Sequence, residues 1–511
     1  MAYSPCYTPR MRTAAFVRLV ACAVFAGAWS AGPAWSASCE SLAQAAFPDA
    51  TVTSAQQMPA GGGPANDLPA HCRVAITLKP SADSDIKSEV WLPSSGWNGK
   101  LLSVGNGGWN GNVDANALAA GLRRGYAVVG SDTGHQGGGG PWMTHTEKLT
   151  DFGYRAIHEM TVKAKSVTST FYGSAAQRAY FQGCSAGGRQ GMMAATRYPD
   201  DFDGIVAGAP VVNTTGRASF AIWIAQQQHR SAESYIPAEK YPAIHQAALK
   251  ACDALDGVTD GVIENPRACT FDPKVLECTA GDNNSCLTAA QVETARAMYK
   301  PAVNPRTGSE IFPGLERGSE MGWATFGGPQ PLALGSQMFQ FMVFNNPAWD
   351  YKTLNFDADM AKVTAIEQGR INVLTPDLSK FAARGGKLIH YHGWADPQVS
   401  SGSSTRFFEA VESKQGGRAA FNDYYRMFMV PGMGHCSGGP GTTSFDMLAS
   451  LEQWVEHGKA PDSIPASKIA NGQVVRTRPL CPYPQVAKYS GRGSSDDAAS
   501  FSCVAPTTGT R

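Results

Sequence analysis

Three side chains in this sequence have the types and the chain order of a serine nucleophile with its acid and its base: Ser185, Asp396 and His435. A serine hydroxyl is a weak nucleophile until a histidine removes its proton, and a carboxylate must hold that histidine in the correct tautomer. Ser185 is the central residue of residues 183–187, which read G-C-S-A-G. A G-x-S-x-G pattern followed by an acid and then a histidine indicates acyl transfer through a covalent serine intermediate.

Such a serine must sit in a sharp turn between a buried strand and a helix, the nucleophile elbow of α/β-hydrolases. Residues 178–182 predict the strand, and residues 188–199 predict the helix, which Pro199 would end. The flanking residues are small because the turn is strained and larger side chains would collide with the strand or the helix. A chance match is the alternative in a chain with 55 glycines, and the strand–helix context argues against it.

The acid and the base each follow a predicted strand. Parallel strands end at one edge of a sheet, so we expect Asp396 and His435 at that edge, beside the nucleophile. His390 and His392 are rivals of His435 for the role of base. The alternative for both rivals is a packed, structural histidine.

The oxyanion of the tetrahedral intermediate needs backbone N–H donors. We expect one from Ala186, the residue after the nucleophile, and one from the glycine-rich residues 105–111, where Gly108 is our candidate. Glycines in this loop would let the backbone approach the substrate. An ordinary glycine-rich turn is the alternative.

The order of strand and helix patterns predicts an α/β-hydrolase fold with a doubly wound, mostly parallel sheet. Predicted strands span residues 73–78, 86–92, 101–104, 126–130, 178–182, 387–391 and 424–430, and predicted helices span residues 153–172, 188–199 and 445–457. Between residues 212 and 379 this alternation stops, and we expect an inserted lid domain there. The catalytic domain would then consist of residues 38–211 and 380–511.

The composition of the chain and its N-terminal segment indicate which partners it lacks and in which compartment it works. The chain has 511 residues, a formal net charge of +1 and no basic run, so we expect no nucleic-acid partner. Residues 1–37 are interpreted as a signal peptide, because Arg10, Arg12 and Arg18 precede an apolar stretch too short to span a bilayer. A membrane anchor is the alternative for this segment. No other window is long and apolar enough to span a membrane, and we expect a secreted or periplasmic protein.

Ten cysteines follow this segment, and an even number in an exported chain indicates disulfides. Cys184 precedes the nucleophile and Cys436 follows the histidine. A disulfide between these two cysteines would tie Ser185 to His435.

This arrangement resembles the tannase/feruloyl esterase family, which includes the bacterial hydrolase of mono(2-hydroxyethyl) terephthalate. The resemblance covers nearly the whole mature chain and rests on residues 183–189, 203–210, 391–393, 430–433, 435–441 and 478–484. It implies a serine carboxylic ester hydrolase. It also implies five disulfides: Cys39–Cys72, Cys184–Cys436, Cys252–Cys269, Cys278–Cys286 and Cys481–Cys503.

Residues 252–262 combine carboxylates and glycines within the predicted lid. Calcium prefers six to eight oxygen ligands from carboxylates and carbonyls. From the spacing alone, a solvated acidic turn is an equal alternative, and the pattern is not that of an EF-hand. The resemblance implies a structural calcium ion held by the carboxylates and carbonyls of Asp253, Asp256, Val258, Asp260 and Val262.

The resemblance further implies esters of gallic, ferulic or terephthalic acid as substrates. Aromatic acids need an apolar slot, and lid aromatics are candidates for it, although a packed lid core explains them equally well: Trp223, Trp323, Phe326, Phe339, Phe341, Phe344, Trp349 and Tyr351. The terephthalate enzyme holds its substrate's carboxylate with a lid arginine. Because no arginine occurs between Arg317 and Arg370 here, we expect neutral phenolic esters, with terephthalate monoesters as the alternative.

Two other function classes compete with this reading. One is a non-catalytic binding module on a hydrolase fold, against which the complete set of serine, acid and histidine argues. The other is a peptidase or lipase on the same fold.

Overall fold

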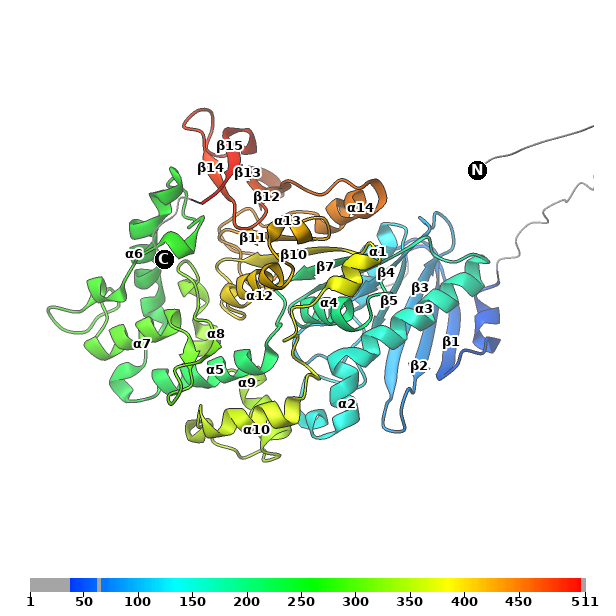
Figure 1. Ribbon diagram of the computed structural model, residues 1–511, viewed down its shortest axis with the longest axis horizontal. Coiled ribbons are helices and arrows are strands. Elements are labelled where there is room, and N and C mark those ends of the chain that lie inside the picture. The colour runs from blue at the N-terminus through cyan, green and yellow to red at the C-terminus, as the bar shows by residue number, and fades with distance from the viewer. Residues whose placement is uncertain (1–36, 62–65, 507–511) are drawn as a thin grey trace, which may run out of the picture. The chain divides into compact units, whose positions relative to one another are not determined.

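The computed structural model describes residues 37–61 and 66–506, all within one compact unit of residues 36–511. Figure 1 shows a twisted central sheet with helices packed on both of its faces. The predicted signal peptide falls almost entirely on residues 1–36, which lie outside the described residues. Within the described ranges, no helix has the length and apolar character needed to cross a bilayer.

The central sheet has nine strands in the order β1-β2-β3-β5-β4-β6-β7-β10-β11. The pairs β1–β2, β2–β3 and β3–β5 are antiparallel, and every later pair is parallel. The strands are β1 (Ala50–Met58), β2 (His71–Leu78), β3 (Ile86–Pro93), β4 (Lys100–Val104), β5 (Ala127–Ser131), β6 (Arg178–Cys184), β7 (Gly204–Gly208), β10 (Lys387–Gly393) and β11 (Tyr425–Val430). The prediction of a doubly wound, mostly parallel sheet is confirmed.

Both faces of the parallel strands are covered, which is why these strands read as continuous apolar runs in the sequence. Along β10, Leu388 packs into the core on one face and Ile389 into the core on the other. One core is closed by α3 (Ala156–Tyr172), α4 (Ala186–Arg197) and α12 (Ser401–Lys414), and the other by α1 (Ala115–Arg123) and α14 (Met447–His457).

The chain leaves the sheet after β7 and returns at β10, and the segment between is the one for which the sequence predicts a lid. This lid segment is largely helical. One buried core consists almost entirely of its residues, and a second core is shared with residues of the catalytic part: Trp109, Trp142, Met143, Leu149 and Phe152. Its main elements are α5 (Thr214–Gln228), α6 (Tyr241–Cys252), α7 (Ala289–Tyr299), α8 (Ala324–Gly327), α9 (Ala333–Gln337), α10 (Ala358–Glu367), α11 (Ser379–Ala383) and the strand pair β8 (Ala302–Val303) and β9 (Glu310–Phe312). Capping helps to start α7, where Thr288 and Gln291 bond each other's backbone reciprocally.

Some elements differ from the sequence predictions. Strand β1 was not expected, because it is a polar edge strand without a buried apolar face. Two C-terminal hairpins were also not expected: β12 (Ile464–Ala470) with β13 (Gln473–Leu480), and β14 (Val486–Tyr489) with β15 (Phe501–Val504). Helix α3 begins at Ala156, later than predicted, because a π-helical turn, Asp151–Arg155, precedes it.

All five disulfides implied by the family resemblance are present. Two of them, Cys252–Cys269 and Cys278–Cys286, lie within the lid. Cys481–Cys503 ties the two C-terminal hairpins together.

Candidate active site

Ser185 lies in the turn between β6 and α4, where the G-x-S-x-G pattern predicts it. Its backbone has φ 63° and ψ −121°, a conformation that residues other than glycine rarely adopt. A Cβ atom at Gly183 would lie 2.7 Å from the Gly187 carbonyl carbon, and one at Gly188 would lie 2.1 Å from the Gly208 oxygen. The packing of strand against helix therefore requires the small residues and holds the serine in its strained conformation.

Asp396 and His435 meet at the carboxyl ends of β10 and β11, as predicted. His435 Nδ1 is 2.7 Å from Asp396 Oδ2, and the carboxylate is fully buried. Burial would by itself raise the pKa of Asp396, but the nearby His435 and hydrogen bonds from His392 and His435 lower it below its usual value. An ionised acid in this position holds the base with its Nε2 available to accept a proton.

Both oxygens of the Asp396 carboxylate have several partners. Oδ1 accepts the backbone N–H groups of Gln398 at 2.8 Å and Val399 at 2.9 Å. Oδ2 is shared by His435 and by His392, whose Nε2 is 3.0 Å away. The sequence alone did not reveal that a second histidine contacts the acid.

The two other histidines considered for the role of base do not reach the cavity. His390 and His392 are fully buried, and neither lines the cavity that contains Ser185. His435 does line that cavity. The structure therefore brings His435 to the nucleophile and places the other two histidines behind the acid.

The disulfide Cys184–Cys436 joins the residue before the nucleophile to the residue after the histidine, with Cα atoms 6.0 Å apart. It holds the elbow next to the histidine loop. Within the described residues, no hydrogen bond joins Ser185 Oγ to His435.

The glycine-rich loop after β4 lies against the elbow. Gly108 and Ala186, the two predicted oxyanion donors, line the same cavity as Ser185. Ala186 is the first residue of α4, where backbone N–H groups have no acceptor within the helix. The loop is anchored by His135 Nε2, which is 2.8 Å from the Trp109 carbonyl oxygen, and by the Asn106 backbone N–H, which donates to Gln190 Oε1.

A cavity of about 560 Å³ opens in front of Ser185. Its aromatic lining comes from Trp109, Phe152 and Tyr391, which all belong to the catalytic domain. Three of the lid aromatics that the sequence offers for this role do not line the cavity: Trp323 and Phe326 lie in the lid core, and Phe339 lies in the core that the lid shares with Trp109 and Phe152. For Trp323 and Phe326, the packed lid core is the arrangement that the structure shows.

Arg217 is a cavity residue that the sequence argument missed. It projects from lid helix α5 into the cavity and is 6% exposed. Its Nε donates to the Gln398 carbonyl oxygen at 2.9 Å, whereas Nη1 and Nη2 bond no other described residue. Burial lowers the pKa of Arg217 to about 10, so it remains a cation at neutral pH. It lies in the lid before Arg317, and therefore outside the stretch between Arg317 and Arg370 whose lack of arginine predicts neutral esters.

The predicted calcium loop is folded back on its own carboxylates. Asp253 accepts the backbone N–H groups of Asp260 at 3.1 Å and Gly261 at 2.9 Å, and Asp256 accepts that of Val258 at 3.0 Å. Asp260 also forms ion pairs with two arginines of β13, Arg476 and Arg478. Burial raises the pKa of Asp256 to about 6, and the neighbouring carboxylates of Asp260 and Asp253 add to this shift.

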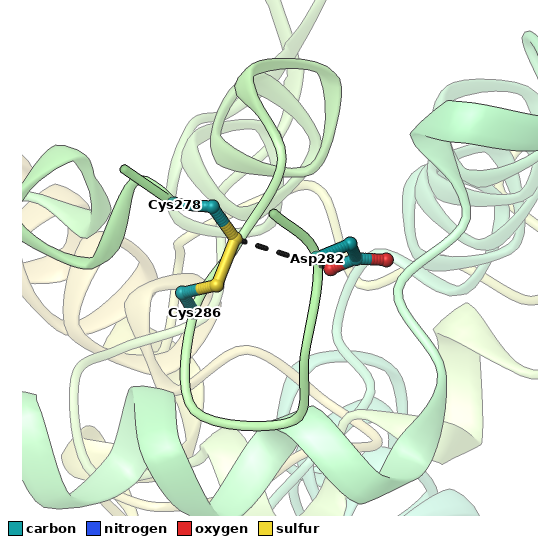
Figure 2. A group of neighbouring side chains, drawn as sticks. All are labelled: Cys278, Asp282 and Cys286. Carbon is teal, nitrogen blue, oxygen red and sulfur yellow. Dashed lines mark hydrogen bonds between the residues drawn. A yellow bond between two sulfur atoms is a disulfide. The ribbon is translucent and has the colours of Figure 1, made fainter. Parts of the chain in front are cut away.

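In the part of the chain that the structure describes, one group of three potential metal-ligating side chains gathers within 4.8 Å: Cys278, Asp282 and Cys286. Figure 2 shows that its two cysteines are joined in a disulfide beside the carboxylate. A disulfide has no thiolate to offer, so this group is not a metal site. The three aspartates of the calcium loop do not all approach one another to that distance.

Comparisons with known proteins show which family this chain resembles. The sequence matches the family described as tannase and feruloyl esterase over residues 72–504. It is 39% identical to an uncharacterised esterase of Xanthomonas campestris pv. campestris, covering 92% of this chain and 91% of that protein. It is 35% identical to a probable feruloyl esterase B-1 of Aspergillus oryzae, covering 93% and 94%. The crystal structure of feruloyl esterase B from Aspergillus oryzae matches with a TM-score of 0.87 at 34% identity, over 91% of this chain and 99% of that one.

Proposed function

We propose that this chain, which belongs to the tannase and feruloyl esterase family and is a carboxylic ester hydrolase, cleaves esters of phenolic acids such as ferulate or gallate. The nucleophile, base and acid are Ser185, His435 and Asp396. The observation that carries this assignment is the contact between His435 and Asp396 at the cavity that also contains the strained Ser185.

In the first half of the reaction, Ser185 Oγ attacks the ester carbonyl carbon while His435 Nε2 takes the hydroxyl proton. The carbonyl oxygen becomes an oxyanion, which the N–H groups of Gly108 and Ala186 stabilise. The C–O bond to the alcohol then breaks. His435 returns its proton to the departing alkoxide, and the acyl group remains on Ser185.

Water completes the reaction by the same steps in reverse. His435 removes a proton from water, and the resulting hydroxide attacks the acyl carbon. The second tetrahedral intermediate collapses to the free carboxylic acid, and the proton on His435 returns to Ser185. Asp396 remains ionised throughout and stabilises the imidazolium that forms in each half.

The cavity supports an aromatic acyl group. Trp109, Phe152 and Tyr391 give it flat apolar walls, which suit a phenolic ring. Relatives named feruloyl esterase B agree with a substrate of this class.

Arg217 favours a second candidate, an ester whose acid carries a free carboxylate, such as a terephthalate monoester. Arg217 lines the cavity, and its Nη1 and Nη2 bond none of the described residues. The Asp396 carboxylate does not pair with them, because its oxygens are occupied by Gln398, Val399, His392 and His435. A substrate carboxylate in this place would gain a charge-assisted, two-point contact.

We further propose that the lid loop binds calcium. The donor set fits this ion chemically, since Asp253, Asp256 and Asp260 offer carboxylates and Val258 and Val262 offer carbonyls. Two of the three carboxylates are already oriented by backbone N–H groups of the same loop. The ion would have a structural role, joining the lid to the C-terminal hairpins through the pairs of Asp260 with β13.

Export, to the periplasm or outside the cell, is the compartment that we propose. Five disulfides favour an oxidising environment, and the sequence of residues 1–37 reads as a signal peptide.

Labelling with a fluorophosphonate probe, combined with a substrate panel, tests the proposed function. We expect the folded protein to be labelled and to hydrolyse methyl ferulate or methyl gallate faster than peptides or long-chain esters. An unlabelled protein would favour the binding module, and a preference for peptides or long-chain esters would favour the peptidase or the lipase.

A further inference from the structure

A chain of buried polar side chains runs from Tyr425 to the acid of the triad. Tyr425 OH is 2.8 Å from His390 Nδ1, and His390 Nε2 is 2.8 Å from Ser404 Oγ. Ser404 Oγ is 2.7 Å from His392 Nδ1, and His392 Nε2 is 3.0 Å from Asp396 Oδ2. All five residues are at most 1% exposed. They come from β11, α12, β10 and the loop after β10, and none of them lines the cavity that contains Ser185.

The hydrogen positions in this series of hydrogen bonds can be assigned starting from Tyr425. Burial raises the pKa of Tyr425 well above its usual value, so its hydroxyl keeps its hydrogen. Among the described residues, His390 Nδ1 is the partner of that hydroxyl. A buried O–H must donate, so His390 Nδ1 is the acceptor and carries no hydrogen. The hydrogen of neutral His390 is therefore on Nε2, which donates to Ser404 Oγ.

The same reasoning fixes the second histidine. Ser404 Oγ contacts the two imidazole rings, and because it accepts from His390 it must donate its own hydrogen to His392 Nδ1. His392 Nδ1 is then an acceptor. Its Nε2 is also 3.0 Å from the Val399 carbonyl oxygen, which can only accept, so Nε2 carries the hydrogen. His392 is thus neutral, and it donates to Asp396.

We propose that His392 is a positioning residue for the triad: a neutral imidazole, locked in its Nε2–H tautomer by Tyr425, His390 and Ser404, that holds the Asp396 carboxylate in place by a directed hydrogen bond. The inference rests on the proposed triad. A neutral donor supports the negative charge of Asp396 without cancelling it, so the carboxylate keeps its charge for the His435 imidazolium. A protonated His392 would instead place a positive charge beside the carboxylate and weaken its attraction for the His435 imidazolium.

Ser404→Ala tests this role, with Ser403→Ala as the matched control. Both serines lie on α12 and are buried, but the Ser403 hydroxyl donates to the Ser400 carbonyl oxygen and does not touch either histidine. We expect Ser404→Ala to lower kcat on the order of tenfold with KM within about twofold, since it disturbs a hydrogen bond to a charged group. Ser403→Ala should keep kcat within about twofold. Equal kcat values in the two folded variants would overturn the proposal.

Histidine side-chain ¹⁵N spectra provide a readout that does not depend on activity. In the wild-type protein at neutral pH, we expect two histidines with bare Nδ1 and protonated Nε2 whose signals change in Tyr425→Phe, a variant that keeps the ring and removes only the hydroxyl. Tyr425→Phe also replaces Ser404→Ala if the latter fails to fold, and it should lower kcat in the same direction. An Nδ1–H tautomer or a doubly protonated ring at either position would overturn the assignment. If Ser185→Ala stayed active, the proposed triad would be wrong whatever these spectra showed.

Discussion

At the scale of single residues, the site contains groups whose conformation or buried charge costs free energy in the folded protein. Ser185 keeps a positive φ, which costs about 1–3 kcal/mol and is imposed by the close packing of β6 against α4. Asp396 is a buried charge, and such a charge is tolerated because donors saturate both of its oxygens. Arg217 is a buried cation whose Nη1 and Nη2 bond no residue in the part of the chain that the structure describes.

Substitution of Arg217 should separate charged from neutral substrates. For mono(2-hydroxyethyl) terephthalate, we expect Arg217→Gln to raise KM about tenfold or more, because a charge-assisted contact to the substrate carboxylate is lost. The matched control substrate is the corresponding neutral diester, which has the same ring and no charge, and its KM should change by less than about threefold. Steady-state kinetics of both esters with both proteins measures this. A parallel change for the two esters would show that Arg217 does not bind the carboxylate.

At the scale of elements, the site is formed where three parallel strands end, at the carboxyl edge of the sheet. Ser185 follows β6, Asp396 follows β10 and His435 follows β11, and the disulfide Cys184–Cys436 connects the first loop to the last. The lid contributes through α5, which brings Arg217 to the cavity.

The disulfide Cys184–Cys436 should matter more to catalysis than to global stability. We expect the Cys184→Ala/Cys436→Ala double variant to lose on the order of a hundredfold in kcat, since a shift of about an ångström in the triad is that costly. It should stay folded by circular dichroism, although such bridges typically contribute about 2–4 kcal/mol to the free energy of unfolding.

The control for this experiment is the Cys481→Ala/Cys503→Ala double variant, which removes a bridge of the C-terminal hairpins. It should keep turnover near that of the wild type. If the two folded double variants lost activity equally, the bridge beside the triad would have no special role in catalysis.

Calcium should stabilise the lid loop. A ligand that binds only the folded state raises stability by mass action, so removal of calcium with a chelator should lower Tm by a few degrees. Asp256→Asn should abolish the calcium-dependent part of the melting shift. Asp282→Asn, a change of the same type in the carboxylate next to Cys278–Cys286, should leave that shift intact. Protein without bound calcium and without a chelator-dependent shift would contradict the proposal.

At the scale of the whole molecule, the features that the sequence predicts are those with a local pattern of apolar and polar residues. The parallel strands are buried on both faces and read as apolar runs, so β4, β6, β10 and β11 were predicted nearly at their observed bounds. The polar edge strand β1 has no such signature, and the sequence patterns did not predict it.

The site residues likewise divide into those that a sequence pattern predicts and those that only tertiary packing determines. Ser185, Asp396 and His435 were predictable because each follows a strand and the chain order is informative. Arg217 was not, because α5 is buried on nearly all sides and only tertiary packing decides which of its residues faces the cavity. The sequence predicts His392 as a packed histidine or a rival base. Its contact with Asp396 depends on how the loop after β10 turns back, and its contact with Ser404 depends on the packing of α12, and neither is visible in the sequence pattern.

The central claim is that Ser185 is the nucleophile of an esterase, and the Ser185→Ala variant tests it most directly. Its hydrolysis of methyl ferulate and methyl gallate should be measured beside the wild type, with fluorophosphonate labelling and circular dichroism of the same preparations. We predict a loss on the order of 10⁴-fold or more, no label and an unchanged fold. A folded variant that retained more than about a tenth of wild-type activity would contradict the assignment of Ser185, His435 and Asp396 as a catalytic triad.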